Sequence, residues 1–293
     1  MEIDISLPVL YDYCNISTLE AKGEVTEQMR QINAKRIVIK VGTSTLTHSN
    51  GKLNLQAIDQ LCYTLSGLVN EGKEVVLVSS GAIGVGLGIL GLQSRPVAIP
   101  EQQAVASVGQ TQLMTVYQQR FSVYGQKIGQ ILLTHDVVDY PISRQNALNT
   151  FENLLQLNVI PIVNENDAIA VDELDHHTKF GDNDQLSAIV AKAIGADLLI
   201  MLSDIDGFYD KNPRKFDDAS LIDRVTEIDD ATFKLAGGRG TKFGTGGMIT
   251  KLKAAEIMLE TKKAMVLANG ENPSIIFKLL DGTNLGTLFM GTD

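Results

Sequence analysis

The chain has 293 residues, 44% of them hydrophobic and 20% charged, so it can bury a sizeable core as one large α/β domain or two smaller ones. Its formal net charge of −10 argues against a general nucleic-acid binder, because neutralising phosphates requires clustered Lys and Arg. No apolar run approaches the roughly 20 residues of a membrane span, and the acidic start at Glu2 and Asp4 is unlike a secretory signal. With only two cysteines, Cys14 and Cys62, the composition predicts a protein of the reducing cytoplasm.

The first 34 residues differ from the rest of the chain. They carry six acidic residues against two basic ones and show no clear hydrophobic period. We predict an appendage of unknown role at residues 1–34, with a short helix near residues 25–33, followed by one domain at residues 35–293.

Residues 36–41 form an apolar, β-branched run that ends at Gly42, which is typical of a buried first strand. Lys40 is an anomaly near the end of this run, because burying an ammonium group is costly unless it meets an anion. We interpret Lys40 as a ligand candidate. The alternative is a lysine that reaches solvent at the strand end.

A helical pattern at residues 55–70 and a second buried strand at residues 74–80 predict a parallel βαβ unit with the first strand. The small residues that follow, beginning with Ser80 and Gly81, let a ligand approach backbone N–H groups at a helix start. The G-x-G-x-x-G motif at residues 86–91 is not a dinucleotide site, because it does not follow the strand directly and no acid lies about 20 residues on. We predict that its glycines allow close helix packing.

Helical and strand patterns alternate along the rest of the chain, which predicts an α/β protein with parallel strands. The predicted helices are residues 101–124, 142–157, 183–194 and 248–259. The predicted strands are residues 128–133, a run starting at Val159, and residues 197–203, 263–268 and 286–290.

The densest polar chemistry follows the strand that starts at Val159. Asp167 closes a run of polar residues after this strand, a polar excursion covers residues 171–179, and Asn183 and Asp184 open the next helix. Because ligands bind past the carboxyl ends of parallel strands, we interpret this stretch as a candidate ligand site. The alternative is a solvated surface loop.

Metal sites have weak signals in this sequence. His176 and His177 lie in an acidic loop, but neighbours in sequence rarely converge on one ion. Asp204 and Asp206 resemble part of a calcium loop, yet the glutamate expected later in such a loop is missing. We therefore assign no metal ligand directly.

A glycine-rich stretch at residues 236–247 leads into the helix at residues 248–259. Exposed N–H groups and the helix dipole at such a junction favour an anion, and Lys251 lies one turn into the helix. This predicts a phosphate cradle, although the stretch is not a Walker loop. A flexible linker with a surface lysine remains the alternative.

Taken together, anion-friendly elements recur at Lys40, at Ser80 and at residues 244–251, while Asp167, Asn183 and Asp184 suit a small zwitterion. This combination indicates phosphoryl transfer from a nucleotide to a small acid. Such a reaction relies mainly on positioning and on neutralising the charge of the transferring group.

Five motifs carry a resemblance to a known family. They are Ile39-Lys-Val-Gly-Thr-Ser44, Ser79-Ser-Gly-Ala82, Val163-Asn-Glu-Asn-Asp-Ala168, Gly181-Asp-Asn-Asp184 and Gly244-Thr-Gly-Gly-Met-Ile-Thr-Lys251. In this order, over residues 36–289, the chain resembles the glutamate 5-kinase family, which has the amino acid kinase fold. The resemblance implies a three-layer αβα sandwich around a mainly parallel open sheet.

The resemblance also implies an activity. It implies ATP-dependent phosphorylation of the side-chain carboxylate of L-glutamate to L-glutamyl 5-phosphate, the first step of proline biosynthesis, with feedback inhibition by proline. Mg²⁺ would bridge the nucleotide phosphates, held largely by them and by water. We also expect a homo-oligomer.

The family's functional positions carry over by motif. The implied glutamate-binding residues are Ser80, Asp167 and Asn183. With Asp167 and Asn183 holding the substrate, residues 171–179 between them are interpreted as a flap over the glutamate site. The implied ATP-binding residues are Lys40, Ser203, Asp204, Thr245, Gly246, Gly247, Met248, Ile249, Thr250 and Lys251. Lys40 and Lys251 would offset charge on the γ-phosphoryl group, and Asp184 would orient them.

The chain departs from the family pattern in two ways. It ends at Asp293 without room for the RNA-binding-like PUA domain that many members carry, and its first strand starts later than usual. Two other functions stay open: a relative of the same fold with another acceptor, such as an acetylglutamate or carbamate kinase, and a noncatalytic amino-acid or nucleotide sensor.

Overall fold

A computed structural model of the chain describes residues 30, 32–48, 51–134, 140–169, 183–237 and 247–292. The flap predicted at residues 171–179, including His176 and His177, lies outside the described residues. So do Thr245 and Gly246 of the predicted phosphate cradle and most of the predicted appendage.

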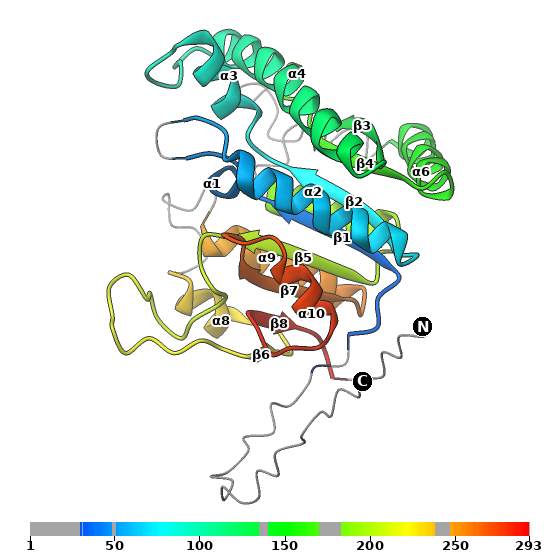
Figure 1. The fold of residues 1–293 in the computed structure, drawn as a ribbon. Coiled ribbons are helices and arrows are strands. Elements are labelled where there is room, and N and C mark those ends of the chain that lie inside the picture. Colours follow the sequence, from blue (N-terminus) through cyan, green and yellow to red (C-terminus); the bar gives the residue numbers. More distant parts are fainter. Residues whose placement is uncertain are drawn as a thin grey trace, which may run out of the picture.

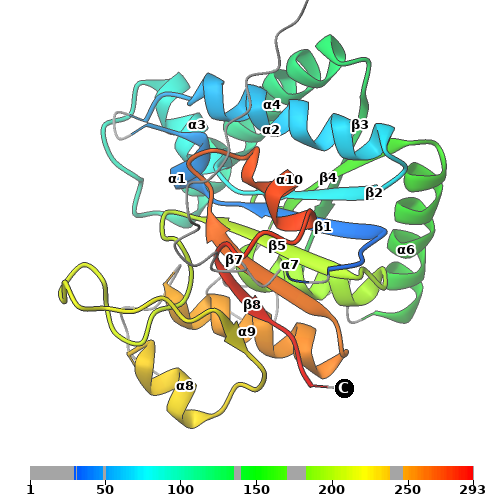
Figure 2. The same cartoon turned by 60° about the horizontal axis from the view of Figure 1, so that its bottom comes forward.

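The described residues build a sheet between two helical layers (Figures 1 and 2). Its strands are β1 (Arg36–Val41), β2 (Glu74–Ser79), β3 (Lys127–Leu133), β4 (Val159–Glu165), β5 (Leu198–Ser203), β6 (Arg224–Val225), β7 (Ala264–Asn269) and β8 (Thr287–Phe289). Their order is β3-β4-β2-β1-β5-β7-β8-β6. Neighbours from β3 to β7 are parallel, and β8 runs antiparallel to β7. The predicted mainly parallel sheet is confirmed.

The helices of the described residues alternate with these strands. They are α1 (Thr43–Leu46), α2 (Leu55–Asn70), α3 (Ala82–Leu90), α4 (Ile99–Val123), α6 (Pro141–Gln156), α7 (Asn183–Ala193), α8 (Asp230–Leu235), α9 (Met248–Glu260) and α10 (Ile275–Leu280). Buried side chains of α2, α3, α4 and α10 pack on one face of the sheet, called here the α2 face. Those of α6, α7, α8 and α9 pack on the other, the α7 face. The three-layer αβα architecture is therefore confirmed.

Burial on both faces explains why β1 is apolar almost throughout. Ile37, Ile39 and Val41 belong to the core of the α2 face, and Val38 to the core of the α7 face. Side chains alternate along a strand, so Lys40 projects to the α7 face, toward α7 and α9.

One glycine of the rejected dinucleotide motif, Gly86, has the predicted packing role, whereas Gly91 meets nothing within 4 Å and ends α3 in the left-handed conformation. A Cβ atom on Gly86 would collide with the backbone carbonyl of Val105, and one on Gly109 with that of Ala82. Glycine at these two positions lets the backbones of α3 and α4 come into contact, which a side chain at either position would prevent.

The start of the described chain is tied to the body. Arg30 donates hydrogen bonds from its guanidinium to the carbonyls of Leu285, Gly286 and Asp223. Residues 30 and 32–34 are not helical, so the helix predicted near residues 25–33 is absent from its described part. The domain boundary after residue 34 stays a prediction.

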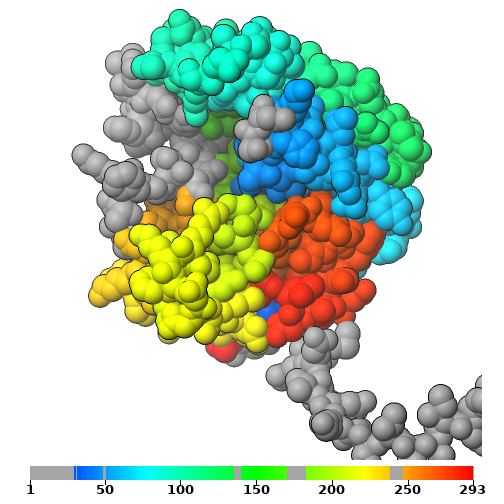
Figure 3. All heavy atoms as spheres, turned by 60° about the vertical axis from the view of Figure 1, so that its left-hand side comes forward, coloured from blue at the N-terminus to red at the C-terminus, as the bar shows by residue number. Residues whose placement is uncertain are grey.

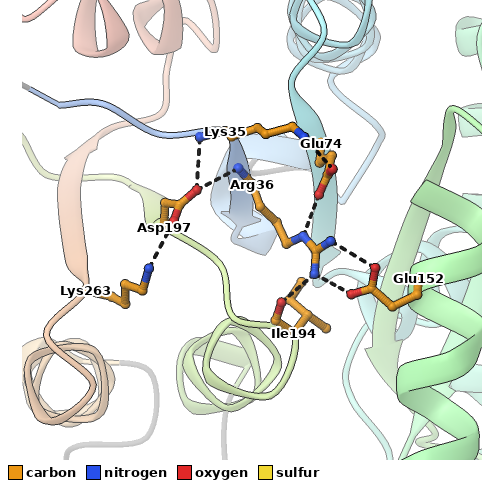
Figure 4. A network of polar contacts seen from close by, with 7 residues as sticks. All are labelled: Lys35, Arg36, Glu74, Glu152, Ile194, Asp197 and Lys263. Atoms are coloured by element: carbon orange, nitrogen blue, oxygen red, sulfur yellow. Dashed lines mark hydrogen bonds and ion pairs between the residues drawn. The ribbon is translucent and has the colours of Figure 1, made fainter. Parts of the chain in front are cut away.

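The amino ends of the strands are joined by a network of charged groups (Figure 4), called here the amino-edge cluster. Its members are Lys35, Arg36, Glu74, Glu152, Asp197 and Lys263. Arg36 makes a two-pronged contact with Glu152 and donates to Glu74 at 2.6 Å and to the carbonyl of Ile194 at 2.6 Å. Asp197 accepts from the backbone N–H groups of Lys35 and Arg36 and from Lys263, each at 3.0 Å. The network fixes the ends of β1, β2 and β5 against one another and against α6.

Candidate active site

The topology directs the candidate site to the carboxyl end of β1. From β1 the chain builds β2, β3 and β4 on one side and then crosses to build β5 and β7 on the other. In open α/β sheets a ligand binds where this direction reverses. Lys40 lies at this point, between β2 and β5.

Three charged side chains meet there from three different elements. The Nζ atom of Lys40, on β1, lies 2.6 Å from Oδ1 of Asp184, on α7. The Nζ atom of Lys251, on α9, lies 3.1 Å from the other oxygen, Oδ2. We call these three residues the carboxyl-edge cluster. Their side chains are 7%, 0% and 8% exposed, so the surface-lysine alternatives for Lys40 and Lys251 are wrong.

Local structure holds this arrangement in place. Asp184 occupies the first turn of α7, where the helix dipole favours a carboxylate. The Thr250 hydroxyl lies 2.7 Å from Oδ2 of Asp184 and 2.8 Å from the carbonyl of Gly247.

The charges in this cluster do not balance. Burial by itself raises the pKa of the Asp184 carboxyl, but the charges of Lys40 and Lys251, with hydrogen bonds from Lys40 and Thr250, outweigh it and hold the pKa below its ordinary value. Asp184 is therefore ionised at neutral pH and offsets one of the two lysines. Within the part of the chain that the structure describes, no second carboxylate forms an ion pair with either lysine, so a buried positive charge remains that suits an anion.

On the β5 side lies a cavity of about 470 Å³, called here the nucleotide cavity after the ATP-binding residues predicted from the sequence. Five predicted ATP-binding residues line it: Ser203, Asp204, Gly247, Met248 and Lys251. Thr250 faces Asp184 instead, and Ile249 belongs to the core of the α7 face. In the space-filling view of Figure 3, the segment after β5 (yellow) forms one side of the molecule, and α3 with the start of α4 (teal) forms the opposite side.

Three further residues of the nucleotide cavity escaped sequence reasoning. They are Tyr209, Lys211 and Arg214, in the segment after β5. Arg214 donates to Oδ2 of Asp204 at 2.6 Å. Burial raises the pKa of the Asp204 carboxyl, but the bond and charge of Arg214, together with hydrogen bonds from the Asp204 backbone and from Ser203, outweigh this and leave the pKa below its ordinary value. The two basic residues flanking the turn at Asn212 were the available signal.

On the β4 side lies a smaller cavity of about 370 Å³, called here the acceptor cavity. Asp167 lines it together with Glu165 and, from α4, Gln110 and Thr111. Nδ2 of Asn183 donates to Oγ of Ser80 at 2.9 Å. Ser80 follows β2, which lies between β4 and β1, so this pair lies between the acceptor cavity and the carboxyl-edge cluster. The predicted site residues that the structure describes thus follow the carboxyl edge of the sheet from β4 to β5.

A cavity of about 620 Å³, larger than either of these, lies between α2 and α10 and contains none of the predicted site residues. We place the site by the buried charge rather than by cavity size, because a buried charge without a counter-charge among the described residues favours an anionic ligand, whereas a surface hollow by itself does not. Within the described ranges, no group of three or more His, Cys, Asp or Glu residues is arranged to hold a metal ion. Nor does any helix there combine the length and apolar character needed to cross a membrane.

Comparison with known proteins agrees with this fold. The sequence profile of the amino acid kinase family matches residues 35–269, and the chain belongs to this family. Among curated relatives, it is similar to a protein named glutamate 5-kinase from Ligilactobacillus salivarius, with 66% identity over 88% of this chain and 96% of that protein. Proteins of the same name from Lactiplantibacillus plantarum and Enterococcus faecalis are each 63% identical over 89% and 88% of this chain and 98% and 95% of their own.

A solved structure supports the same fold. An isopentenyl phosphate kinase from T. acidophilum, in a product complex, superposes with a TM-score of 0.58 over 86% of this chain and 99% of that one. At 17% identity this likeness concerns the fold alone.

Proposed function

We propose that this protein is a glutamate 5-kinase, which transfers the γ-phosphoryl group of ATP to the side-chain carboxylate of L-glutamate. The observation that carries the proposal is the buried carboxyl-edge cluster, in which two lysines share a single carboxylate. The names of relatives with 58–66% identity support the same activity.

The two lysines supply positive charge that offsets the repulsion between the reacting groups. Transfer brings an anionic carboxylate to an anionic phosphoryl group, so repulsion is the main obstacle. Lys40 and Lys251 present fixed positive charge that needs no rearrangement as charge develops on the phosphoryl oxygens. Asp184 holds both ammonium groups in place, because each bonds a different oxygen of its carboxylate.

No general base is required. The side-chain carboxyl of glutamate, with a pKa of about 4.3, is already ionised at neutral pH. One of its oxygens forms a bond to the γ-phosphorus, while the bond from that phosphorus to the β,γ-bridging oxygen breaks and ADP leaves. Because the substrate carboxyl is already ionised, Asp184 does not need to act as a base, which agrees with a role in orienting the lysines.

Mg²⁺ is the implied cofactor. Lacking a preformed cage of carboxylates among the described residues, the protein fits an ion held by nucleotide phosphates and water. When bound, the ion supplies further charge neutralisation. Lys40 and Lys251 act beside it.

The polar residues on the β4 side suit an amino acid as acceptor. Asp167 lines the acceptor cavity, where its carboxylate suits the ammonium group of an amino acid. Asn183 commits its amide nitrogen to Ser80 and Asn164, which leaves its carbonyl oxygen to accept from a ligand. Feedback inhibition by proline, a homo-oligomer and a cytoplasmic location belong to the same proposal and rest on the family resemblance.

The test is a coupled assay of the purified protein. Incubation with Mg-ATP, L-glutamate and hydroxylamine should release ADP and trap the acyl phosphate as glutamyl hydroxamate. Acetylglutamate and carbamate in place of L-glutamate are the controls. Product from one of those acceptors alone would reassign the protein within the family, and the absence of turnover with every acceptor would favour the sensor.

A further inference from the structure

The acceptor cavity contains carboxylates but no described cation. Glu165 and Asp167 are the charged side chains that line it within the described ranges. An amino-acid substrate brings a carboxylate as well as an ammonium group, so the hydrogen-bond donors among the described lining residues are candidates to bind that carboxylate.

Side-chain amides connect the active site to this cavity, forming what we call the amide relay: Asn183, Asn164 and Gln110. Nδ2 of Asn183 donates to Oδ1 of Asn164 at 2.9 Å, and Nδ2 of Asn164 donates to Oε1 of Gln110 at 2.9 Å. The relay therefore runs from the start of α7, across the end of β4, to the middle of α4.

Backbone groups fix the direction of this relay. The N–H group of Glu165 can only donate, and it lies 2.9 Å from Oδ1 of Asn164. Nδ2 of Asn164 must then face Gln110, so Gln110 must turn its oxygen, Oε1, toward Asn164. The amide nitrogen of Gln110, with two N–H groups, is left on the side away from the relay.

We propose that Gln110 donates hydrogen bonds to the α-carboxylate of the amino-acid substrate, and that Asn164 positions the amide of Gln110 for this role. This inference rests on the proposed function. Gln110 lines the acceptor cavity while Asn164 does not, so the amide nitrogen is the end of Gln110 that faces the cavity. Among the described residues this nitrogen has no hydrogen-bond partner.

Other polar residues of α4 do not fill this role. The hydroxyl of Ser107 donates to the carbonyl of Gln103 at 2.9 Å, and that of Thr111 donates to the carbonyl of Ser107 at 3.1 Å. Their hydrogens are thus used within the helix. Gln130 and Asn166 also line the cavity, but no described side-chain hydrogen bond fixes the direction of either amide.

The order of the strands identifies which carboxylate Gln110 contacts. β4 lies two strands from β1, which is roughly 10 Å at about 4.8 Å per strand. The carboxylate that accepts the phosphoryl group must reach Lys40, at the end of β1. The opposite end of the substrate, which carries the ammonium and α-carboxylate groups, then lies toward Asp167 and Gln110.

Two isosteric variants test the proposal. Gln110→Glu keeps an oxygen for Asn164 and replaces the two N–H groups with a charged oxygen. Asn164→Asp keeps the bonds from Asn183 and Glu165 but cannot donate, so Gln110 reverses its amide. Gln112→Glu, exposed on α4 and outside the cavity lining, adds the same charge as a matched control.

Steady-state kinetics with L-glutamate and ATP should separate the roles. We expect Gln110→Glu to raise the KM for L-glutamate on the order of 10²-fold and Asn164→Asp about tenfold, with the KM for ATP unchanged. The inhibition constant of 4-aminobutanoate, which is glutamate without its α-carboxylate, should stay the same in both variants. Gln112→Glu should match the wild type in all three measurements.

The outcomes separate the two proposals. Wild-type protein that makes no hydroxamate from L-glutamate would refute the proposed function. An active wild type whose KM for L-glutamate does not change in Gln110→Glu refutes the role of Gln110 alone. The role of Gln110 is also refuted if binding of 4-aminobutanoate weakens by the same factor, because the effect of the variant would then not depend on the α-carboxylate.

Discussion

β1 carries a cation near each end, and the two cations have different surroundings. Arg36, at its first residue, donates to two carboxylates and a carbonyl. Lys40, near its last residue, shares one carboxylate with Lys251. The amino-edge cluster holds three acids and three bases, whereas the carboxyl-edge cluster holds one acid and two bases. In this strand, the cation whose charge is balanced by neighbouring acids has a structural role. The cation that shares its one acid with a second lysine lies at the candidate active site.

Burial separates the two clusters further. In the amino-edge cluster, the side chains of Glu152 and Lys263 are 45% and 38% exposed, so water screens their charges. In the carboxyl-edge cluster Asp184 has no exposed surface, and its charge is needed to keep the two lysines in the interior. Loss of a carboxylate should therefore have very different consequences at the two ends of the sheet.

The largest expected effect is on stability. Asp184→Asn leaves Lys40 and Lys251 buried without a counter-charge, and we expect it to lower the free energy of unfolding by about 3–5 kcal/mol. Asp197→Asn, in the partly exposed amino-edge cluster, should cost about 1 kcal/mol or less. Urea unfolding of both variants measures the difference. Equal losses would show that burial does not distinguish the clusters.

The next effect is on catalysis. Lys251→Met should reduce kcat on the order of 10²-fold or more, because it removes positive charge from the transferring phosphoryl group. Lys263→Met removes a lysine of the same kind from the amino-edge cluster and should leave kcat unchanged. The hydroxamate assay measures both. Near-normal turnover in Lys251→Met would return this lysine to a purely structural role.

The smallest effect concerns acid stability. The pKa of Asp184 is lowered in the folded protein, so its contribution to stability is fully present above the unfolded value of about 3.9 and is lost as pH falls through the lower folded pKa. Asp197 has a pKa lowered in the same direction, because hydrogen bonds from Arg36, Lys263 and Lys35 outweigh its burial. Between pH 5 and the acid transition, unfolding free energies should fall more steeply for wild type than for Asp184→Asn. Parallel curves would contradict an ionised Asp184.

Much of the fold followed from local pattern. Residues 55–70 have the spacing of a helix, and α2 has these bounds; the strand predicted at residues 128–133 differs from β3 by one residue. Hydrophobic periodicity is encoded within each element, so it can be recognised without the fold. β6 has only two residues, too short to show a period, and was not predicted. β8 lies within the strand predicted at residues 286–290, but its antiparallel direction depends on where α10 returns the chain.

The candidate site was predictable where an apolar run ends in a polar residue or contains a charge. Lys40, Asp184 and Lys251 were found in this way, and their contact agrees with the prediction that Asp184 orients the lysines. Gln110 and Arg214 gave no comparable signal. Gln110 is one of several glutamines on a long helix, and its orientation depends on Asn164, 54 residues away.

The sequence by itself determined the α/β alternation, the family motifs and the placement of polar residues at strand ends, because each depends on residues close together in the chain. It could not show which charges surround Arg36 and Lys40, the two cations of β1. Only the tertiary structure decided that Glu74 and Glu152 balance the first and that Lys251 adds to the charge of the second. The energy of a buried charge depends on the charges folded around it, and these come from strands and helices distant in sequence.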